Sequence, residues 1–431
     1  MSIPELASGQ LPSPDTQAVL LLCGRFGRSR DGVIPLSDSE YNQMAVWLHR
    51  QGLRPADLLE EDGRQKLLTE GPPLPAQRLS ELLERGVALA LAVEGWTNKG
   101  LWVLSRSDDR YPKRLKGRGK RSQAPPVLYG AGDLSLLSGG GLAIVGSREA
   151  SEEALDFARR VARACAEQGI QMISGGARGV DNEAMSAALA SGGSAVGVLA
   201  NDLARTATRG KYRSAIQDGT LALISPYDPG SGFNVGHAMR RNRYIYNLAD
   251  FGLVASSSSG SGGTWQGAID AIKAREPVFV WAGGQQVPEG NRQLIERGAL
   301  PFPEGPWKKL RDDLTKAHFS SRAAEPFQEK LIDEDPRAIT HAERPLTEPE
   351  TGHEPPSLPA TAYEAVLPVM LHHLREPQSS KKVAELLDVG SGQAQAWLTK
   401  ALEQKKVAKL TRPVRYVVAD AGDDGRGGQS S

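Results

Sequence analysis

Two glycine-rich turns carry the residue types best suited to binding a phosphate group. The first is GSR at 146–148 and the second is SGGARGVD at 174–181. Each follows a short apolar run and precedes a helical pattern, so backbone N–H groups and a helix N-terminus can face an anion. Glycines alone would fit a tight turn equally well, but an arginine inside the turn favours a phosphate contact. The candidate ligands are Ser147, Arg148, Gly175, Arg178 and Gly179.

A third candidate lies in the segment MRRNR at 239–243. The apolar pattern that follows, from Tyr244 onward, predicts a helix that begins within this cluster. Cations at a helix N-terminus oppose the helix dipole by roughly 0.3–1 kcal/mol each. A polyanion or an acidic partner would offset that cost, which favours a binding role for the cluster. Its candidate contacts are Arg240, Arg241, Asn242 and Arg243.

The segment 99–121 is strongly basic, with nine Lys or Arg residues against two acids. Its run KRLKGRGKR, at 113–121, contains two glycines and is expected to be mobile and exposed. A basic loop is usually only a solvated surface, yet beside a phosphate-binding sheet it could guide a strand. Lys113, Arg114 and Lys116 are therefore further candidate nucleic-acid contacts.

The elements that must position these turns alternate between strand and helix. Apolar runs predict strands at 143–145, 172–174, 194–200, 221–225, 251–256 and 278–281. Helical patterns are found at 152–168, 182–190 and 265–273, whereas the basic residues of 205–213 are expected in a loop. Ser151 is expected to cap the first of these helices. The alternation predicts an α/β fold with an extended Rossmann-like parallel sheet, whose ligands bind beyond the carboxyl ends of its strands.

The flanking sequence predicts further parts. Helical patterns dominate 16–96, after a Pro- and Ser-rich start that is expected to be disordered. This helical region fits an interaction module or a packing subdomain. Near the C-terminus, a helix, a helix-turn-helix and a β-hairpin follow in the order of a winged helix, which binds DNA or protein. The predicted parts are a helical N-terminal module (1–98), a Rossmann-like core (99–310), a disordered linker (311–360), a winged helix (361–419) and a disordered tail (420–431).

Composition argues against several classes of function. The 431 residues carry a formal net charge of +1, so a polyanion must bind to local patches. Cys23 and Cys165 lie far apart in apolar contexts, which fits free thiols in a reducing compartment. The chain has no secretory signal and no apolar run near about 20 residues, so a soluble cytoplasmic protein is expected. No zinc-ligand spacing, nucleophilic triad or carboxylate pair stands out, so neither a cofactor nor enzymatic activity is expected.

Together these motifs resemble the DNA processing protein A family, also called DprA or Smf. The resemblance covers roughly 102–302 and, more weakly, the C-terminal winged helix. It rests on DDRYP (108–112), PPVLY (125–129), IVGSR (144–148), SGGARGVD (174–181), RNR (241–243) and the segment 290–299. No single element is decisive, but five or six in the family's order are specific.

The resemblance implies a protein that binds single-stranded DNA, usually as a homodimer. It also implies loading of a RecA-type recombinase onto that DNA, in recombination and transformation. The family's phosphate pocket maps onto the two glycine turns and onto 241–243, with Lys113–Arg121 extending the track. Family members are not known as enzymes. Tyr244 and Trp265 are candidate stacking partners for bases, and packing explains them equally well.

Two departures from the family leave other interpretations open. The basic residue and the Phe-Pro pair that often precede the RNR motif are absent, and Arg240 could substitute. The turn with Gly262, Gly263 and Thr264 is similar to that of lysine-decarboxylase-like phosphoribohydrolases, which carry a glutamate two residues after the threonine. Gln266 takes that place here, and glutamine cannot act as a carboxylate base. A nucleotide-binding sensor, for instance in phage defence, is the alternative function, and a protein-interaction scaffold is the third.

Overall fold

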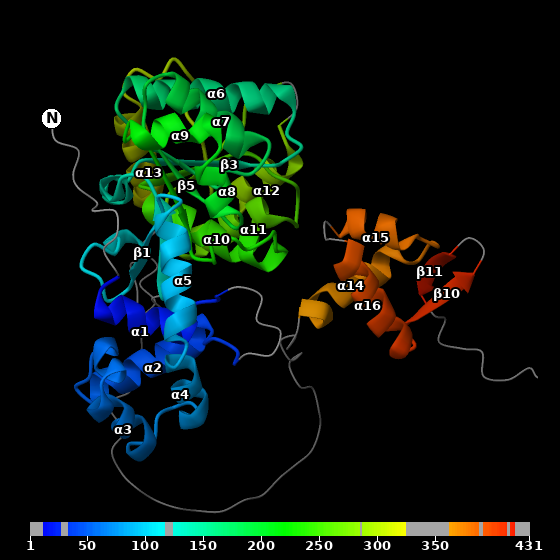
Figure 1. Cartoon of the computed structure of the whole chain (residues 1–431). Coiled ribbons are helices and arrows are strands. Elements are labelled where there is room, and N and C mark those ends of the chain that lie inside the picture. The colour runs from blue at the N-terminus through cyan, green and yellow to red at the C-terminus, as the bar shows by residue number, and fades with distance from the viewer. Residues whose placement is uncertain are drawn as a thin grey trace, which may run out of the picture. The chain divides into compact units, whose positions relative to one another are not determined.

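Short runs of small and β-branched apolar residues form the strands at the centre of the chain. The computed structural model describes residues 12–26, 33–116, 124–284, 287–324, 362–387, 391–411 and 414–418. Within it the chain forms two compact units, Met1–Pro326 and Phe327–Ser431 (Figure 1). All of the predicted phosphate-binding residues belong to the first unit.

The first unit contains a nine-stranded sheet in the order β1-β2-β6-β5-β4-β3-β7-β8-β9. The strands β3 to β9 are parallel, whereas β1 and β2 run antiparallel to their neighbours at one edge. Their bounds are β1 Trp102–Ser105, β2 Val127–Ala131, β3 Leu142–Gly146, β4 Met172–Ser174, β5 Ala195–Val198, β6 Leu221–Ser225, β7 Phe251–Ser256, β8 Val278–Val280 and β9 Leu300–Pro301. The predicted α/β fold is confirmed, and each predicted parallel strand is found within two residues of its expected ends.

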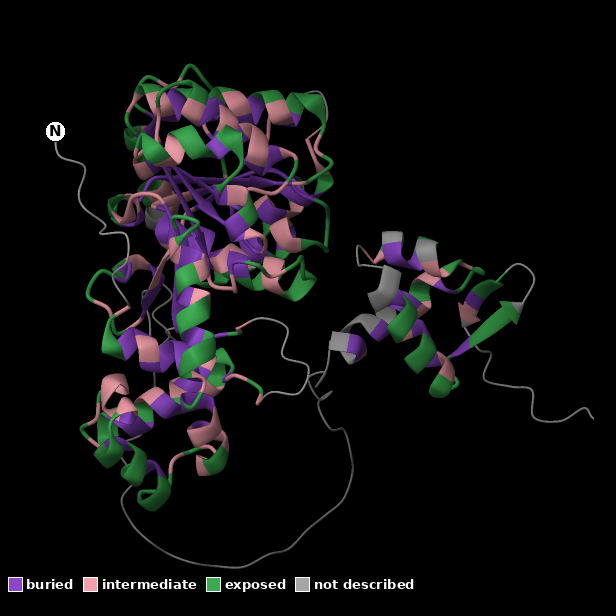
Figure 2. Cartoon of the chain, viewed as in Figure 1, coloured by how far each residue is buried: buried purple, intermediate pink, exposed green. Residues whose placement is uncertain are grey.

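Helices cover both faces of this sheet, because alternate strand residues point to opposite sides. In β3, Leu142 and Ile144 pack into one apolar cluster while Ala143 and Val145 pack into the other. The strands are buried between the two helical layers (Figure 2). One layer contains α6 Glu152–Glu167, α7 Val180–Ala190, α8 Leu203–Ala207, α9 Gly210–Gln217 and α13 Leu310–Ala324. The other contains α10 Val235–Leu248, α11 Gly263–Lys273 and α12 Glu289–Glu296.

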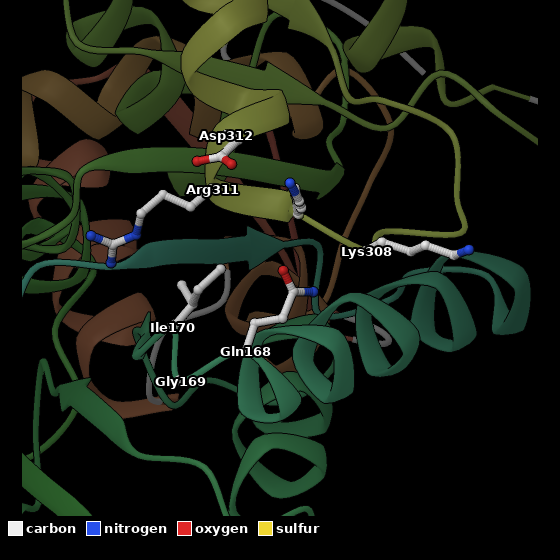
Figure 3. A pocket seen from close by; sticks show the side chains of 7 residues that line it. Gln168, Gly169, Ile170, Lys308, Arg311 and Asp312 are labelled. Carbon is white, nitrogen blue, oxygen red and sulfur yellow. The ribbon is translucent and has the colours of Figure 1, made fainter.

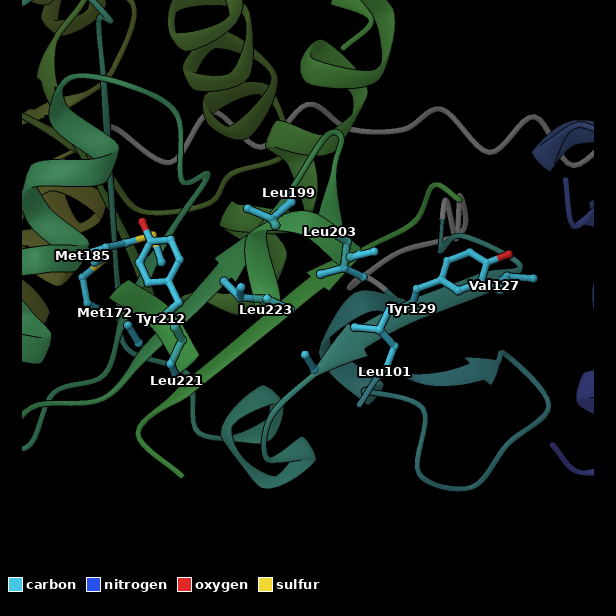
Figure 4. Close-up of a cluster of buried hydrophobic side chains, with 14 of the residues drawn as sticks. Leu101, Val127, Tyr129, Met172, Met185, Leu199, Leu203, Tyr212, Leu221 and Leu223 are labelled. Carbon is cyan, nitrogen blue, oxygen red and sulfur yellow. The ribbon is translucent and has the colours of Figure 1, made fainter. Parts of the chain in front are cut away.

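The N-terminal helices share the core of the sheet. The Trp96 ring lies 4.9 Å from the Tyr129 ring of β2, and the Thr16 and Ser105 hydroxyls hydrogen-bond at 2.9 Å. Figure 4 shows Tyr129 and Leu101 in the same apolar cluster as Leu221 and Leu223 of β6. The predicted N-terminal module and Rossmann-like core therefore pack as one unit. The helices are α1 Pro14–Cys23, α2 Asp38–Arg50, η1 Pro55–Leu59, α3 Glu61–Thr69, α4 Ala76–Leu83 and α5 Gly86–Thr97.

Several sequence expectations were wrong at the level of single elements. Helix α1 begins at Pro14, inside the segment expected to be disordered, because Ser13 caps it. The basic segment that starts at Lys99 contains strand β1 and the 3₁₀ helix η2 (Lys113–Lys116), and residues 117–121 lie outside the described residues. The expected loop at 205–213 holds parts of α8 and α9, and the expected linker begins with α13.

The described residues of the second unit form three helices and a β-hairpin. They are α14 Ala362–His373, α15 Ser380–Leu386, α16 Ser391–Glu403, and the antiparallel strands β10 Val407–Thr411 and β11 Val414–Val418. Met370, Val383 and Leu398, one from each helix, are fully buried in its own apolar core. The order of elements is the expected one, and the assignment as a winged helix stays a prediction. Residues 325–361 and 419–431, which hold most of the predicted linker and the predicted tail, lie outside the described residues.

Candidate nucleic-acid interface

The two glycine turns lie side by side at the carboxyl edge of the sheet, tied together by a carboxylate of the chain itself. Asp181, in the first turn of α7, accepts the Gly146 N–H at 3.2 Å and the Gly175 N–H at 3.1 Å. It is 5% exposed. Asp181 thus accepts N–H groups that the sequence analysis assigned to a phosphate. The Gly175 N–H therefore holds the two turns together as part of the frame of the site and is not free to bind a ligand.

Close backbone contact explains why this frame needs glycine. Gly179 has φ +86°, and a Cβ there would lie 2.5 Å from the Ser147 carbonyl oxygen and 2.9 Å from the Arg148 Cα. Gly179 packs against the first turn in this way, and the Val180 N–H donates to the Ser147 carbonyl at 3.4 Å. Both the positive φ and the close approach exclude a side chain, so this glycine is a structural requirement of the paired turns.

Arg241 is the buried counter-charge of this frame. A Cβ at Gly175 would lie 1.5 Å from Arg241 Nη1 and 2.6 Å from Asp181 Oδ2, so these two atoms are at most 4.1 Å apart. Burial raises the pKa of Asp181, and Arg241 together with backbone N–H groups opposes that rise. Burial also lowers the pKa of Arg241, and the nearby charge of Arg148 lowers it further. The guanidinium stays charged, because its ordinary pKa is far above neutral.

The second turn keeps a row of open donors beside two exposed arginines. Among the described residues, the N–H groups of Gly176, Arg178 and Gly179 make no hydrogen bond. Arg178 is 78% exposed, and its one ion pair, to the exposed Glu149, is long at 3.9 Å. Arg148 is also exposed. Backbone N–H groups in a turn with positive φ at Gly176 and Gly179, flanked by cations, are the kind of donors that can bind an anion.

The arginines at 240–243 are adjacent in the sequence, but in the helix their side chains point in different directions. Helix α10 begins at Val235, with Asn234 as its cap, so the arginines lie in its second and third turns and not at its N-terminus. Consecutive helical residues point about 100° apart. Arg240 is exposed, Arg241 is buried, and Asn242 donates to the Gly263 carbonyl at 2.7 Å. Arg243 lies over the Tyr244 ring at 5.1 Å. Of the four, Arg240 is left as an exposed candidate contact.

The predicted basic track is not brought together with the glycine turns. Arg114 in η2 donates to the Ser138 carbonyl and pairs with Asp250 at 3.0 Å. Asp250 directly precedes β7, so this pair lies at the amino edge, at the other end of α10 from its cap. A helix of that length separates the two ends by roughly 20 Å. Lys113 and Lys116 of the same short helix are exposed.

A shallow basic hollow lies at this amino edge. It has a volume of about 430 Å³ and is lined by Gln168, Gly169, Ile170, Lys308, Lys309, Arg311 and Asp312 (Figure 3). Gln168 shapes it by donating to the Trp307 carbonyl at 2.8 Å and accepting from the Leu310 N–H at 2.8 Å. Arg311 also pairs with Asp250 at 3.7 Å. The cations that line this hollow form a second basic group, remote from the glycine turns.

The two predicted stacking partners are unavailable to bases. Tyr244 is 2% exposed and Trp265 is 7% exposed, and both belong to the apolar cluster beneath α10 and α11. An arginine covers each ring, Arg243 over Tyr244 and Arg297 over Trp265 at 5.0 Å. Packing therefore explains both residues.

The turn at 262–264, which the sequence analysis compares with that of phosphoribohydrolases, is tied to α10 through the bond from Asn242 to Gly263. Gln266 donates to Asp270 at 2.8 Å on the helix surface. A hollow of about 900 Å³ at the carboxyl ends of β7 and β8 is lined by other residues: Ser151, Glu153, Ser256, Gly284, Val287, Pro288, Glu289 and Arg292. Its one arginine already pairs with Glu289 at 2.6 Å, so its charge does not favour a phosphate.

Sequence reasoning missed two features of the site. Asp181 is part of the SGGARGVD motif but is not among the candidate residues. A carboxylate at the start of a helix, where an external anion would otherwise bind, could have indicated its role. Phe233, in the loop before α10, is 44% exposed and carries Arg148 over its ring at 4.8 Å. A lone phenylalanine in a Gly- and Ser-rich loop gave no periodic signal.

Comparison with known proteins places this geometry in a family. The family model of DNA recombination-mediator protein A matches residues 102–306. The Smf protein of Escherichia coli K12 is 30% identical over 273 residues, which span 61% of this chain and 68% of that protein. The chain belongs to the DNA processing protein A family. The DprA protein of Streptococcus pneumoniae R6 is also 30% identical, over 46% of this chain and 70% of its own length.

One solved structure of the family agrees with the fold, and a second is also similar to the chain. The X-ray structure of Streptococcus pneumoniae DprA matches 62% of this chain and 90% of its own, with a TM-score of 0.50 and 22% identity. A Helicobacter pylori DprA structure, described for its single-stranded DNA binding mode, matches with a TM-score of 0.40 and 23% identity, over 50% of this chain and 94% of its own. The family match at 102–306 includes both glycine turns and all of α10.

Further features of the described residues bear on the class of function. The two cysteines are free, and burial raises the pKa of Cys165 to about 12. No group of three or more His, Cys, Asp or Glu residues could hold a metal ion in the described ranges. Nor does any helix in the described part of the chain have the length and apolar character needed to cross a bilayer.

Proposed function

We propose that the chain binds single-stranded DNA along the carboxyl edge of its sheet, with a phosphate held at the second glycine turn. One observation carries this proposal. The open N–H groups of Gly176, Arg178 and Gly179 stand beside the exposed Arg178 and Arg148. The Helicobacter pylori member of the family is described as binding single-stranded DNA, and we extend that ligand to this chain.

Electrostatics at the site support an anionic ligand. Arg148 lies close enough to Arg241 that its charge lowers the pKa of the buried guanidinium. The Nε and Nη1 atoms of Arg241 are buried without a hydrogen-bond partner. Asp181 offsets the charge of Arg241, but these two nitrogen atoms stay unbonded, and each unsatisfied buried donor costs about 1–3 kcal/mol. A phosphate above the turns would reduce that cost and the repulsion between Arg148 and Arg241.

Within this proposal the residue roles change from those expected. Arg148, Arg178 and Arg240 contact the strand, while Asp181, Gly175, Gly179 and Arg241 hold the turns. Ser147 belongs to the frame, since its N–H donates to the Ser256 carbonyl at 2.8 Å and its hydroxyl accepts from the Glu149 N–H at 3.1 Å. Asn242 and Arg243 position α10, and Arg114 is held at the other edge.

We further propose that the protein acts in the cytoplasm as a homodimer that protects the strand and loads a RecA-type recombinase onto it. The family's description as a recombination mediator supports this role. We propose no enzymatic activity, because Gln266 stands where the similar phosphoribohydrolases carry a glutamate and glutamine cannot act as a base. Its amide is instead bonded to Asp270.

The test is fluorescence anisotropy of labelled single-stranded and duplex oligonucleotides at two salt concentrations. We expect preference for the single strand, and an affinity that falls steeply with salt because phosphate contacts release counterions. Arg178→Ala is expected to weaken binding at low salt without lowering the melting temperature, because its side chain is exposed.

Two results would contradict the proposal. Absence of binding at low salt would rule out the function, and unchanged binding by Arg178→Ala together with Arg148→Ala would rule out the site. Lys273→Ala is the matched control, since Lys273 is an exposed cation near the C-terminal end of α11.

A further inference from the structure

A small exposed apolar surface lies beside the phosphate-binding turns. Among the described residues of 102–306, the large apolar side chains that lie exposed are Phe233, Val235 and Met239, at 44%, 38% and 43%. Val235 and Met239 are four residues apart in α10, so they share one side of the helix. Exposed apolar side chains that gather in this way mark binding surfaces, whereas scattered ones need no explanation. These three residues are named the apolar platform.

Arg148 joins the apolar platform to the first glycine turn. Its guanidinium carbon lies 4.8 Å from the centre of the Phe233 ring, which is a cation–π contact. Its backbone packs against Gly179 of the second turn. The Phe233 ring is therefore one arginine side chain away from both turns, and the exposed Arg240 directly follows Met239.

The loop that presents Phe233 is fixed on its C-terminal side. Asn234 caps α10 by accepting the His237 N–H at 3.0 Å. The Tyr227 ring stacks on the His237 ring with centres 3.7 Å apart and planes 6° apart. The Tyr227 hydroxyl also donates to the His237 carbonyl at 3.0 Å. An aromatic side chain on such a held loop loses little conformational entropy when a ligand covers it.

We propose that the apolar platform stacks unpaired bases of the strand whose phosphate occupies the glycine turns. This inference rests on the proposed function and adds to it the means by which a single strand is selected. Each base in a duplex is covered on both faces and paired at its edge, so only a single strand can lay a base on Phe233. The flanking cations Arg148 and Arg240 match a phosphate backbone, which favours a nucleic acid over an apolar protein partner.

The experiment compares two single-stranded ligands of equal length, an oligothymidine and an oligonucleotide of abasic sites. Both carry the same phosphates, and only the first carries bases. Anisotropy titrations use the full chain as wild type, Phe233→Ala, Phe233→Trp and Phe319→Ala. Phe319 in α13 is 63% exposed and serves as the matched control. Melting temperatures establish that each variant is folded.

For oligothymidine, Phe233→Ala is expected to weaken binding roughly 5- to 150-fold, the range measured for loss of one base–aromatic stack. For the abasic ligand it is expected to change nothing, Phe233→Trp is expected to restore binding, and Phe319→Ala is expected to be silent. The dependence of binding on salt should stay as in the wild type, since no phosphate contact is removed.

Three results would overturn the inference. Equal affinity of Phe233→Ala and wild type for oligothymidine would show that no base stacks there. Equal losses on both ligands would show that Phe233 only positions Arg148. Failure of the wild type to bind either ligand would overturn the proposed function and this inference together, whereas the first two results would leave the proposed function intact.

Discussion

Cations cluster at both edges of the sheet. Only at the carboxyl edge do they lie next to a buried Asp–Arg pair that fixes the backbone around them. At the carboxyl edge, Arg148 and Arg178 stand exposed above the buried Asp181 and Arg241, with open N–H groups between them. At the amino edge, Asp250 lies between Arg114 and Arg311, at 3.0 Å and 3.7 Å. The cations of the amino edge are thus partly neutralised by a neighbouring acid.

The difference shows that a count of positive charges does not locate a binding site. Ion pairs on a protein surface contribute about 0–1 kcal/mol and are screened by salt. Those of Asp250 are only partly exposed, and Asp250 also accepts one backbone N–H, from Gly141 at 3.0 Å. The buried carboxylate of Asp181 differs because it accepts N–H groups from both glycine turns and so fixes where the remaining donors point. A binding site in this fold is therefore better located by the buried groups that order the backbone around its cations than by the number of cations.

Loss of the buried carboxylate should have the largest effect. Asp181→Ala leaves the Gly146 and Gly175 N–H groups without acceptors and leaves the charge of Arg241 buried and uncompensated. We expect the free energy of unfolding to fall by about 3–5 kcal/mol, as for the breaking of a buried pair. Asp250→Ala removes two partly exposed ion pairs and the acceptor of one N–H group, that of Gly141, and should cost less, about 1–2 kcal/mol.

Urea titration of both variants measures the two costs. If Asp181→Ala were no more destabilised than Asp250→Ala, the carboxyl edge would not depend on a buried carboxylate more than the amino edge does. The double variant Asp181→Leu with Arg241→Met should recover much of the loss, because it removes both buried charges together.

Two glycine substitutions test whether the backbone of the glycine turns is more tightly packed than that of a turn at the amino edge. Gly179→Ala places a Cβ 2.5 Å from the Ser147 carbonyl oxygen at φ +86°, whereas a Cβ at Gly169, φ +65°, meets nothing within 4 Å. Strain and overpacking should together destabilise Gly179→Ala by roughly 2–4 kcal/mol. Gly169→Ala should cost only the backbone term, roughly 1–2 kcal/mol. Thermal melts of the pair measure the difference, and equal melting temperatures would show that the turns can separate without cost.

Much of the sheet could be predicted from the sequence, because its strands are short apolar runs that end in turn residues. Both glycine turns were located for the same reason. The roles of single residues could not be predicted, since they depend on partners far along the chain. The bonds from Gly146 and Gly175 to Asp181 are set by the register of β3 against β4, which no local pattern contains.

The arginine cluster shows the same limit in another way. Its residues are adjacent in the sequence, yet a shift of the helix start from 239 to 235 changes which of them faces the sheet. The pattern before Met239 is Gly- and Asn-rich, so it gave no helical signal, although Asn234 is a good cap. Phe233 was overlooked because the exposure of one aromatic residue follows from packing and not from periodicity.

Charge reversal compares the two edges in DNA binding. Arg178→Glu should weaken single-strand binding by on the order of tenfold or more, and lower the slope of log affinity against log salt by about 0.7 for a lost phosphate contact. Lys308→Glu changes the net charge by the same amount at the amino edge and should have a much smaller effect. Equal losses in both variants would mean that the strand follows overall charge and not the framed turns.

The smallest expected effect concerns His237, which lies in the first turn of α10, just after the Phe233 loop. Burial and the nearby charges of Arg240 and Arg25 lower its pKa to about 4, from an ordinary value of 6.5. The unfolded chain therefore binds a proton in the window between these two values while the folded chain does not. Stability linked to His237 is fully present above about pH 6.5 and is lost as the pH falls toward 4.

Urea midpoints at pH 7 and pH 5 measure this loss. His237→Gln keeps a polar side chain without a titrating group, so its midpoint should fall less between the two pH values than that of the wild type. His49→Gln, at an exposed histidine of α2, is the control and should follow the wild type. If the midpoint of His237→Gln fell as much as that of the wild type, the pKa of His237 would not be lowered in the folded chain, and the start of α10 after Phe233 would be open to solvent.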